Sequence, residues 1–121
     1  MKKMISIADA ELPIMKVLWE KGELTSPEIL ANLEGNKSTL KTLLKRLVEK
    51  GVVRASEINT RTYRYAPAVS QEDYIQRERR NFLQKVFDGS KQKMLLNFVK
   101  EENITKADIE ELLQMIEEER I

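Results

Sequence analysis

The sequence predicts a mainly helical protein with one small β-hairpin, and three observations support this fold class. Apolar residues recur at three- and four-residue steps over most of the chain, which is typical of amphipathic helices. Two short runs rich in β-branched and aromatic residues, 52–58 and 62–66, flank a three-residue loop. Charged residues make up 34% of the chain and aromatic residues only 6%, a mixture that favours helix.

Three helices are expected before the hairpin. The first covers residues 9–21, and Ser26 is expected to cap a shorter second helix that reaches to about residue 33. Asn36 is expected to cap the third helix, which runs to residue 50. Three helices followed by a two-stranded hairpin is the element order of a winged helix-turn-helix.

The third helix has the chemistry expected of a helix that reads DNA. Leucines repeat along one of its faces, and the opposite face is polar and basic. In a helix-turn-helix the second helix of the pair lies in the major groove, where hydroxyl, amide and ammonium groups bond to base edges and phosphates. The candidate DNA contacts on this helix and at its entry are Asn36, Lys37, Ser38, Thr39, Lys41, Thr42, Lys45 and Arg46.

The hairpin adds Arg61 at its tip and Arg64, cations that supply affinity but little sequence choice. Residues 36–64 hold eight Lys or Arg against two Asp or Glu, a net charge of +6 in a chain whose total is +1. Such a local excess is expected of a nucleic-acid footprint. For each lysine taken singly, a solvated helix surface is the alternative, and Arg46 could instead pair with Glu49 or Glu57.

Composition excludes most catalytic chemistry. The chain has no cysteine and no histidine, so thiolate nucleophiles, imidazole bases and the usual zinc ligands are absent. We therefore expect no enzyme, no cofactor and no metal, and the acidic run 117–119 is interpreted as a solvated helix end. Trp19, Tyr63 and Tyr65 are expected to pack in the core or the wing. Without a signal peptide or a long apolar run, a cytoplasmic protein is expected.

A second, helical part is expected after the hairpin, so that residues 1–69 form the DNA-binding domain and residues 70–121 form three helices. Lobes as small as 70–121 bury too little apolar surface to be stable alone. We therefore expect this part to pair with a second copy of the chain. The candidate dimerisation residues are Phe82, Leu83, Val86, Phe87, Leu95, Leu96, Val99, Leu112, Met115 and Ile116.

Two other functions are alternatives to DNA binding. A winged-helix scaffold can serve as a protein-interaction adaptor that binds no specific DNA, because fold does not fix function. The concentration of cations on the third helix and the hairpin argues against that alternative. A hydrolase with paired carboxylates has little support, because the acids are spread along helix surfaces without a cleft signal.

Five segments in order resemble the penicillinase and methicillin-resistance repressors: ISIADAELPIMKVLW, STLKTLLKRLVEKGVV, RTYRYAP, SQEDYI and MLLNFVKEENIT. The resemblance covers nearly the whole chain. It implies a winged-helix homodimer that binds a palindromic operator in double-stranded DNA and represses a β-lactamase or resistance operon. The sequence departs from the family at 35–38, where the entry to the third helix lacks a Trp-Ser-Pro type of turn.

The resemblance also implies a mode of inactivation. Members of that family are cut by a protease after a membrane sensor detects the antibiotic, and the scissile bond corresponds here to Asn97-Phe98 within a Leu-Asn-Phe stretch. Packing of an apolar helix would produce the same letters, so both interpretations stay open. Copper-responsive relatives carry a cysteine-rich tail, and that sensing mode is excluded because this chain has no cysteine.

Overall fold

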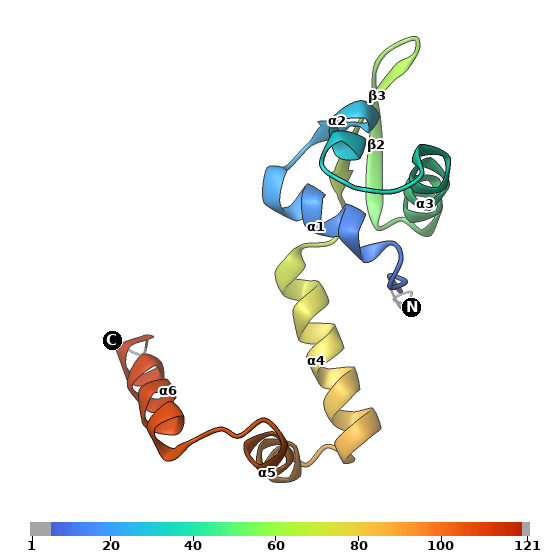
Figure 1. Cartoon of the computed structure of the whole chain (residues 1–121). Helices are drawn as coiled ribbons and strands as arrows, with labels where there is room; N and C mark the ends of the chain where they lie inside the picture. Colours follow the sequence, from blue (N-terminus) through green and yellow to red (C-terminus); the bar gives the residue numbers. More distant parts are fainter. Residues whose placement is uncertain (1–5, 120–121) are drawn as a thin grey trace. The chain divides into compact units, whose positions relative to one another are not determined.

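The computed structural model describes residues 6–119 and divides the chain into two compact units, Met1–Tyr74 and Ile75–Ile121. Figure 1 shows the order of the elements along the chain. They are α1 (Leu12–Lys21), β1 (Leu24–Thr25), α2 (Ser26–Ala31), α3 (Lys37–Lys50), β2 (Val53–Asn59), β3 (Thr62–Pro67), α4 (Gln71–Phe87), α5 (Lys91–Glu101) and α6 (Lys106–Glu119). Three helices and a small sheet thus precede three further helices, as the sequence predicts.

The core of the first unit is an apolar cluster to which α1, α2, α3 and β2 all contribute. Its buried members are Ile14, Met15, Leu18, Ile29, Leu44, Leu47, Val52 and Val53. Trp19 packs against this cluster, and its indole Nε1 donates a hydrogen bond of 2.8 Å to the carbonyl oxygen of Val69. The bond anchors the segment that leaves β3, and Tyr74 in the first turns of α4 lies against the same indole, with ring centroids 5.3 Å apart.

The sheet has three antiparallel strands in the order β1-β3-β2, one more than the sequence predicts. In the additional pairing Leu24 lies opposite Tyr65 and Thr25 opposite Arg64. A strand of two residues has no periodicity of its own, so the sequence gives no local signal for it. The strand β1 forms because its backbone N–H and C=O groups find partners on the free edge of β3, which follows about 40 residues later in the sequence.

Two expected helix starts are wrong, and side-chain hydrogen bonds explain both. Helix α1 begins at Leu12 rather than at residue 9, because Glu11 turns its carboxylate back onto the N–H of Ala8. Helix α2 is capped by Thr25 rather than by Ser26: the Thr25 hydroxyl accepts from the N–H of Glu28, and the Glu28 carboxylate accepts from the N–H of Thr25. This reciprocal capping box needs a Thr three residues before a Glu, a spacing that Ser26 lacks.

Helix α2 also ends earlier than expected, at Ala31 rather than near residue 33. The side-chain amide of Asn32 donates 2.8 Å to the carbonyl oxygen of Glu28, which satisfies a carbonyl that a further turn would otherwise use. Helix α3 matches its prediction: Asn36 caps its start, and Gly51 follows its end with a left-handed φ of 84°. Only glycine adopts that conformation without strain.

In the second unit the helix starts are well defined but the side chains are not buried. Ser70, Ser90 and Thr105 each accept a hydrogen bond from a backbone N–H three residues further on. Phe82, Phe87 and Phe98 have ring centroids 5.7 to 6.3 Å apart. No described side chain of α4, α5 or α6 is buried.

The boundary between the two units lies after Tyr74, inside α4. The division inferred from the sequence, 1–69 and 70–121, follows the loop before this helix instead. It assigns DNA binding to the first part and dimerisation to the second, and as a functional division it stays a prediction.

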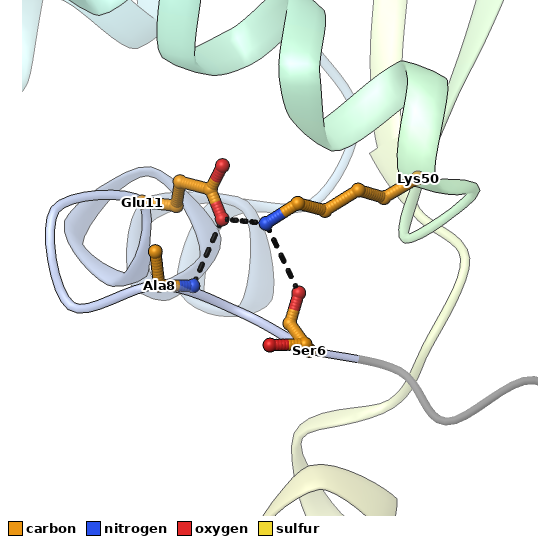
Figure 2. Close-up of polar contacts among 4 residues, drawn as sticks. All are labelled: Ser6, Ala8, Glu11 and Lys50. Atoms are coloured by element: carbon orange, nitrogen blue, oxygen red, sulfur yellow. Dashed lines mark hydrogen bonds and ion pairs between the residues drawn. The ribbon is translucent and has the colours of Figure 1, made fainter.

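An ion pair between the buried Glu11 and the exposed Lys50 joins the start of α1 to the end of α3 (Figure 2). Glu11 is 1% exposed, and its Oε1 accepts from the N–H of Ala8 at 2.9 Å and from Lys50 Nζ at 2.5 Å. Lys50 Nζ also donates 3.2 Å to the carbonyl oxygen of Ser6. Burial raises the pKa of Glu11, but the bonds from Lys50 and Ala8 and the charges of Lys50 and Arg46 together hold that pKa below its ordinary value of 4.5.

Replacing Glu11 by Gln tests this pair. We expect the free energy of unfolding at pH 7 to fall by about 1–3 kcal/mol, because the charge-assisted hydrogen bond is lost and the ammonium of Lys50 no longer has a carboxylate partner. Since the pKa of folded Glu11 is lowered, its contribution is full above the ordinary value of 4.5 and disappears as the pH falls through the folded pKa. We therefore expect the free energy of unfolding of the variant to fall less than that of the wild type as the pH is lowered through this range.

Fluorescence of Trp19, the one tryptophan of the chain, reports unfolding of the first unit by denaturant at each pH. Glu20→Gln, which removes an exposed acid from the same helix, is the matched control and should leave the stability unchanged. An E11Q protein with the stability and acid dependence of the control would contradict the role of the pair.

Candidate nucleic-acid interface

Helix α3 separates an apolar face from a polar one. Leu40, Leu44 and Leu47 are buried, and the last of them is fully buried in the core cluster. Because these leucines fix the rotation of the helix about its axis, the remaining side chains must face outward. Those of the predicted DNA contacts on α3 are all exposed: Lys37, Ser38, Thr39, Lys41, Thr42, Lys45 and Arg46.

Asn36 has a structural role as well as an exposed position. Its Oδ1 accepts from the N–H of Thr39 at 3.2 Å, so the side-chain carbonyl is engaged as the cap of α3. The amide nitrogen of Asn36 keeps two N–H donors, and a phosphate oxygen is the partner they suit best. Asn36 therefore fits a phosphate contact rather than the bidentate recognition of a base, which needs both groups.

The hydroxyl of Thr42 donates 3.0 Å to the carbonyl oxygen of Ser38, one turn earlier in α3. A hydroxyl has one proton and two lone pairs, so this bond leaves Thr42 as an acceptor. In the major groove the partners of an acceptor are the amino groups of adenine and cytosine. The sequence places Thr42 at the surface, but only the structure shows which hydrogen-bonding role remains to it.

Arg46 pairs with neither of the acids suggested by the sequence. Within residues 6–119 no ion pair joins it to Glu49 or Glu57, although all three are exposed. Its charge acts on Glu11, whose pKa it helps to lower after the larger effects of burial and of Lys50. The Arg46 side chain is therefore exposed on α3 without an ion pair to either of these acids.

The hairpin formed by β2 and β3, called the wing, carries Arg61 in its turn and Arg64 on a strand. Arg61 lies in the turn between β2 and β3, where its backbone N–H donates 3.2 Å to Oδ1 of Asn59. Arg64 lies on the central strand β3, opposite Ser56 on one side and Thr25 on the other. Both side chains are exposed, so both are accessible to a phosphate backbone.

Arg64 also has an electrostatic neighbour on α2. The pKa of Glu28 is lowered first by the backbone N–H and the hydroxyl of Thr25, and in smaller measure by the charge of Arg64. The capping box of α2 therefore places a carboxylate near one of the candidate cations. Arg61, in the turn of the wing, is not among the charges that lower the pKa of Glu28.

The aromatic residues of the first unit divide between core and surface. Trp19 and Tyr65 pack against the core cluster, as expected. Tyr63 lies two residues before Tyr65 on β3 and is 43% exposed, so it lies outside the core. Alternation along a strand puts both tyrosines on one face, but only the position of Tyr65 is covered by helices.

The remaining candidate residues lie in the second unit. Asn97 and Phe98 are exposed residues of α5, and the Phe98 ring belongs to the group of three phenylalanines. Leu83, Phe87 and Val99 are partly buried, and the other candidate dimerisation residues are exposed: Phe82, Val86, Leu95, Leu96, Leu112, Met115 and Ile116. Between residues 6 and 119, no helix is long and apolar enough to span a membrane, and no group of three or more acids is arranged to hold a metal.

Three helices that support a β-wing, with a basic helix on the outside, define a winged helix-turn-helix regulator. The family model described as penicillinase repressor matches residues 7–118. The chain belongs to the penicillinase repressor family, as its sequence motifs suggest. Its relatives are transcriptional repressors and not enzymes.

Individual relatives agree with this assignment. The penicillinase repressor of Bacillus licheniformis is 32% identical and aligns with 99% of this chain and 96% of its own length. The methicillin resistance regulatory protein MecI of Staphylococcus aureus is 29% identical, over 94% of this chain and 95% of its own. The solved DNA binding domain of the repressor BlaI is 33% identical, covers 61% of this chain and 94% of that chain, and superposes with a TM-score of 0.53.

Proposed function

We propose that this protein is a transcriptional repressor that binds a palindromic operator as a homodimer, with α3 of each copy in a major groove. The exposed polar and basic face of α3 is the observation that carries the proposal, because the buried leucines leave that face free for a ligand. Family membership supports repression as the outcome. Because the repressors that it resembles are bacterial, and bacterial DNA lies in the cytoplasm, we expect the protein to act there.

The side chains of α3 divide into two roles. Lys41 and Lys45 lie one turn apart on the exposed face and suit guanine edges or phosphates, whereas Thr42 can accept a bond from an amino group of a base. Asn36 and Lys37 at the start of the helix suit phosphates. Arg61 and Arg64 on the wing add affinity at the neighbouring backbone.

The first experiment is selection of binding sites from random duplex DNA, followed by titration of the selected site at two salt concentrations. Recovery of a palindrome whose affinity falls steeply with salt is the expected result, because cations on α3 and the wing displace counterions from the phosphates. Weak binding to all duplexes alike, without enrichment of a site, would favour the adaptor alternative.

Single substitutions of Lys41 and Lys45 by Ala test the face of α3. We expect each to lower operator affinity and, where the lysine contacts a phosphate, to reduce the slope of log affinity against log salt by about 0.9. Lys16→Ala, which removes an exposed lysine from α1, is the matched control and should change neither quantity. If K41A and K45A bind as K16A does, α3 is not the reading helix.

The second unit supports a homodimer. Its three helices expose large apolar side chains and bury none of those described, although helices with one apolar face gain most of their stability by packing. A second copy of the same unit offers the same apolar faces, as closed two-fold pairing requires. The dimer then presents two first units to the two halves of a palindrome.

Charged substitutions on α6 test the dimer. Leu112→Asp and Ile116→Asp should weaken self-association and operator binding together, since a buried unpaired carboxylate is costly. Analytical ultracentrifugation gives the mass, and titration of the selected operator gives the affinity. Gln114→Asp, which adds the same charge at another exposed position of α6, is the control. Variants with unchanged mass and affinity would place the interface elsewhere.

We further propose that a protease in the pathway of a membrane sensor inactivates the repressor by cutting between Asn97 and Phe98. Both side chains are exposed, and α5 buries none of its residues, so little holds this helix against the local unwinding that a protease requires. The cut separates Phe98, the end of α5 and all of α6 from Phe82, Phe87 and the rest of the chain. Loss of the dimer and release of the operator then follow.

Cleavage is tested in cells that carry the sensor pathway, before and after exposure to a β-lactam. Mass spectrometry should detect a fragment ending at Asn97 and one beginning at Phe98 after exposure. Asn97→Asp should slow their appearance, because it places a charge at the scissile bond, whereas Asn81→Asp on α4 should not. Derepression while the wild-type chain stays intact would contradict the proposal.

A further inference from the structure

The wing carries an apolar patch that the first unit does not use for its own packing. Among the described residues of that unit, the exposed large apolar side chains are Ile58, which is 47% exposed, and Tyr63, which is 43% exposed. Both lie in the hairpin, and the other large apolar residues described in the unit are buried or partly buried. Two exposed apolar residues in one hairpin indicate an interaction surface more than exposed residues scattered over the unit would.

The register of the hairpin brings the two residues together. Glu57 lies opposite Tyr63 and Asn59 lies opposite Thr62, so Ile58 is an extra residue in β2 at an irregularity of the register, next to the residue that pairs with Tyr63. An extra residue of this kind redirects a side chain and sharpens the local twist of the strands. The patch therefore lies at the end of the wing, which extends beyond the helices of the first unit (Figure 1).

The charges around the patch favour a polyanion. The hairpin holds Arg54, Arg61 and Arg64 against the single acid Glu57, a net charge of +2. Arg61 lies in the turn immediately beyond the patch. An apolar surface next to exposed arginines matches duplex DNA, whose deoxyribose rings are apolar and alternate with phosphates along the groove walls.

We propose that Ile58 and Tyr63 pack against deoxyribose groups of the operator while Arg61 holds the adjoining phosphates. The inference rests on the proposed function and adds two residues to the interface, neither of which is a cation or a hydrogen-bonding residue of α3. The patch supplies affinity through apolar contact, and that part of the affinity does not depend on salt because it releases no counterions.

The test compares operator titrations of Ile58→Thr and Tyr63→Thr at several salt concentrations. Threonine keeps the strand propensity of the hairpin while it removes apolar area. We expect each variant to bind about 5- to 10-fold more weakly than the wild type at every salt concentration, with an unchanged salt slope. Arg61→Ala should instead reduce the slope.

Matched controls separate the apolar contact from other effects. Tyr63→Phe and Ile58→Val keep most of the apolar surface and should bind as the wild type does. Thermal unfolding of the first unit, followed by the fluorescence of Trp19, should be the same for all variants. Threonine variants that bind as the wild type does, or that lose salt slope as Arg61→Ala does, would overturn the inference and leave the repressor intact. A wild type without salt-dependent operator binding would instead overturn the proposed function.

Discussion

Burial of one leucine stripe of α3 is the constraint on which the rest of the first unit depends. Leu44 and Leu47 lie in the core cluster together with residues of α1 and β2. Successive residues of a helix are rotated by about 100°, so no other stripe can enter the core without withdrawing this one. The polar face of α3 is exposed as a consequence of core packing, and its position requires no ligand.

The far end of the same helix is fixed by polar contacts. Lys50, the last residue of α3, bonds to Glu11 and to the carbonyl of Ser6, and Gly51 then turns the chain into β2. The hairpin begins two residues later, so the ion pair fixes the end of α3 close to the start of β2. The charge of the exposed Arg46 also helps, in smaller measure, to lower the pKa of the buried Glu11 carboxylate.

Signals that are local in sequence predicted most of this structure. The cap Asn36, the stop Gly51 and the leucine spacing gave the bounds of α3, and the alternating runs gave the hairpin. Long-range contacts were not predictable in the same way: β1 forms only because β3 offers an edge, and Lys50 bonds to Glu11 across 39 positions of the sequence. In the site, exposure could be inferred from periodicity, but the hydrogen bond of Thr42 could not.

The two units differ in what their stability requires, and this difference bears on regulation. The first unit has its own core, whereas the helices of the second bury none of their described side chains. In the proposed dimer, joining two reading units makes binding of the second half-site intramolecular, which typically raises affinity by about 10²- to 10⁴-fold. The proposed cut in the second unit would remove that gain and leave the core of the first unit intact. Under this proposal, regulation acts on the unit that buries none of its described side chains and leaves the face of α3 unchanged.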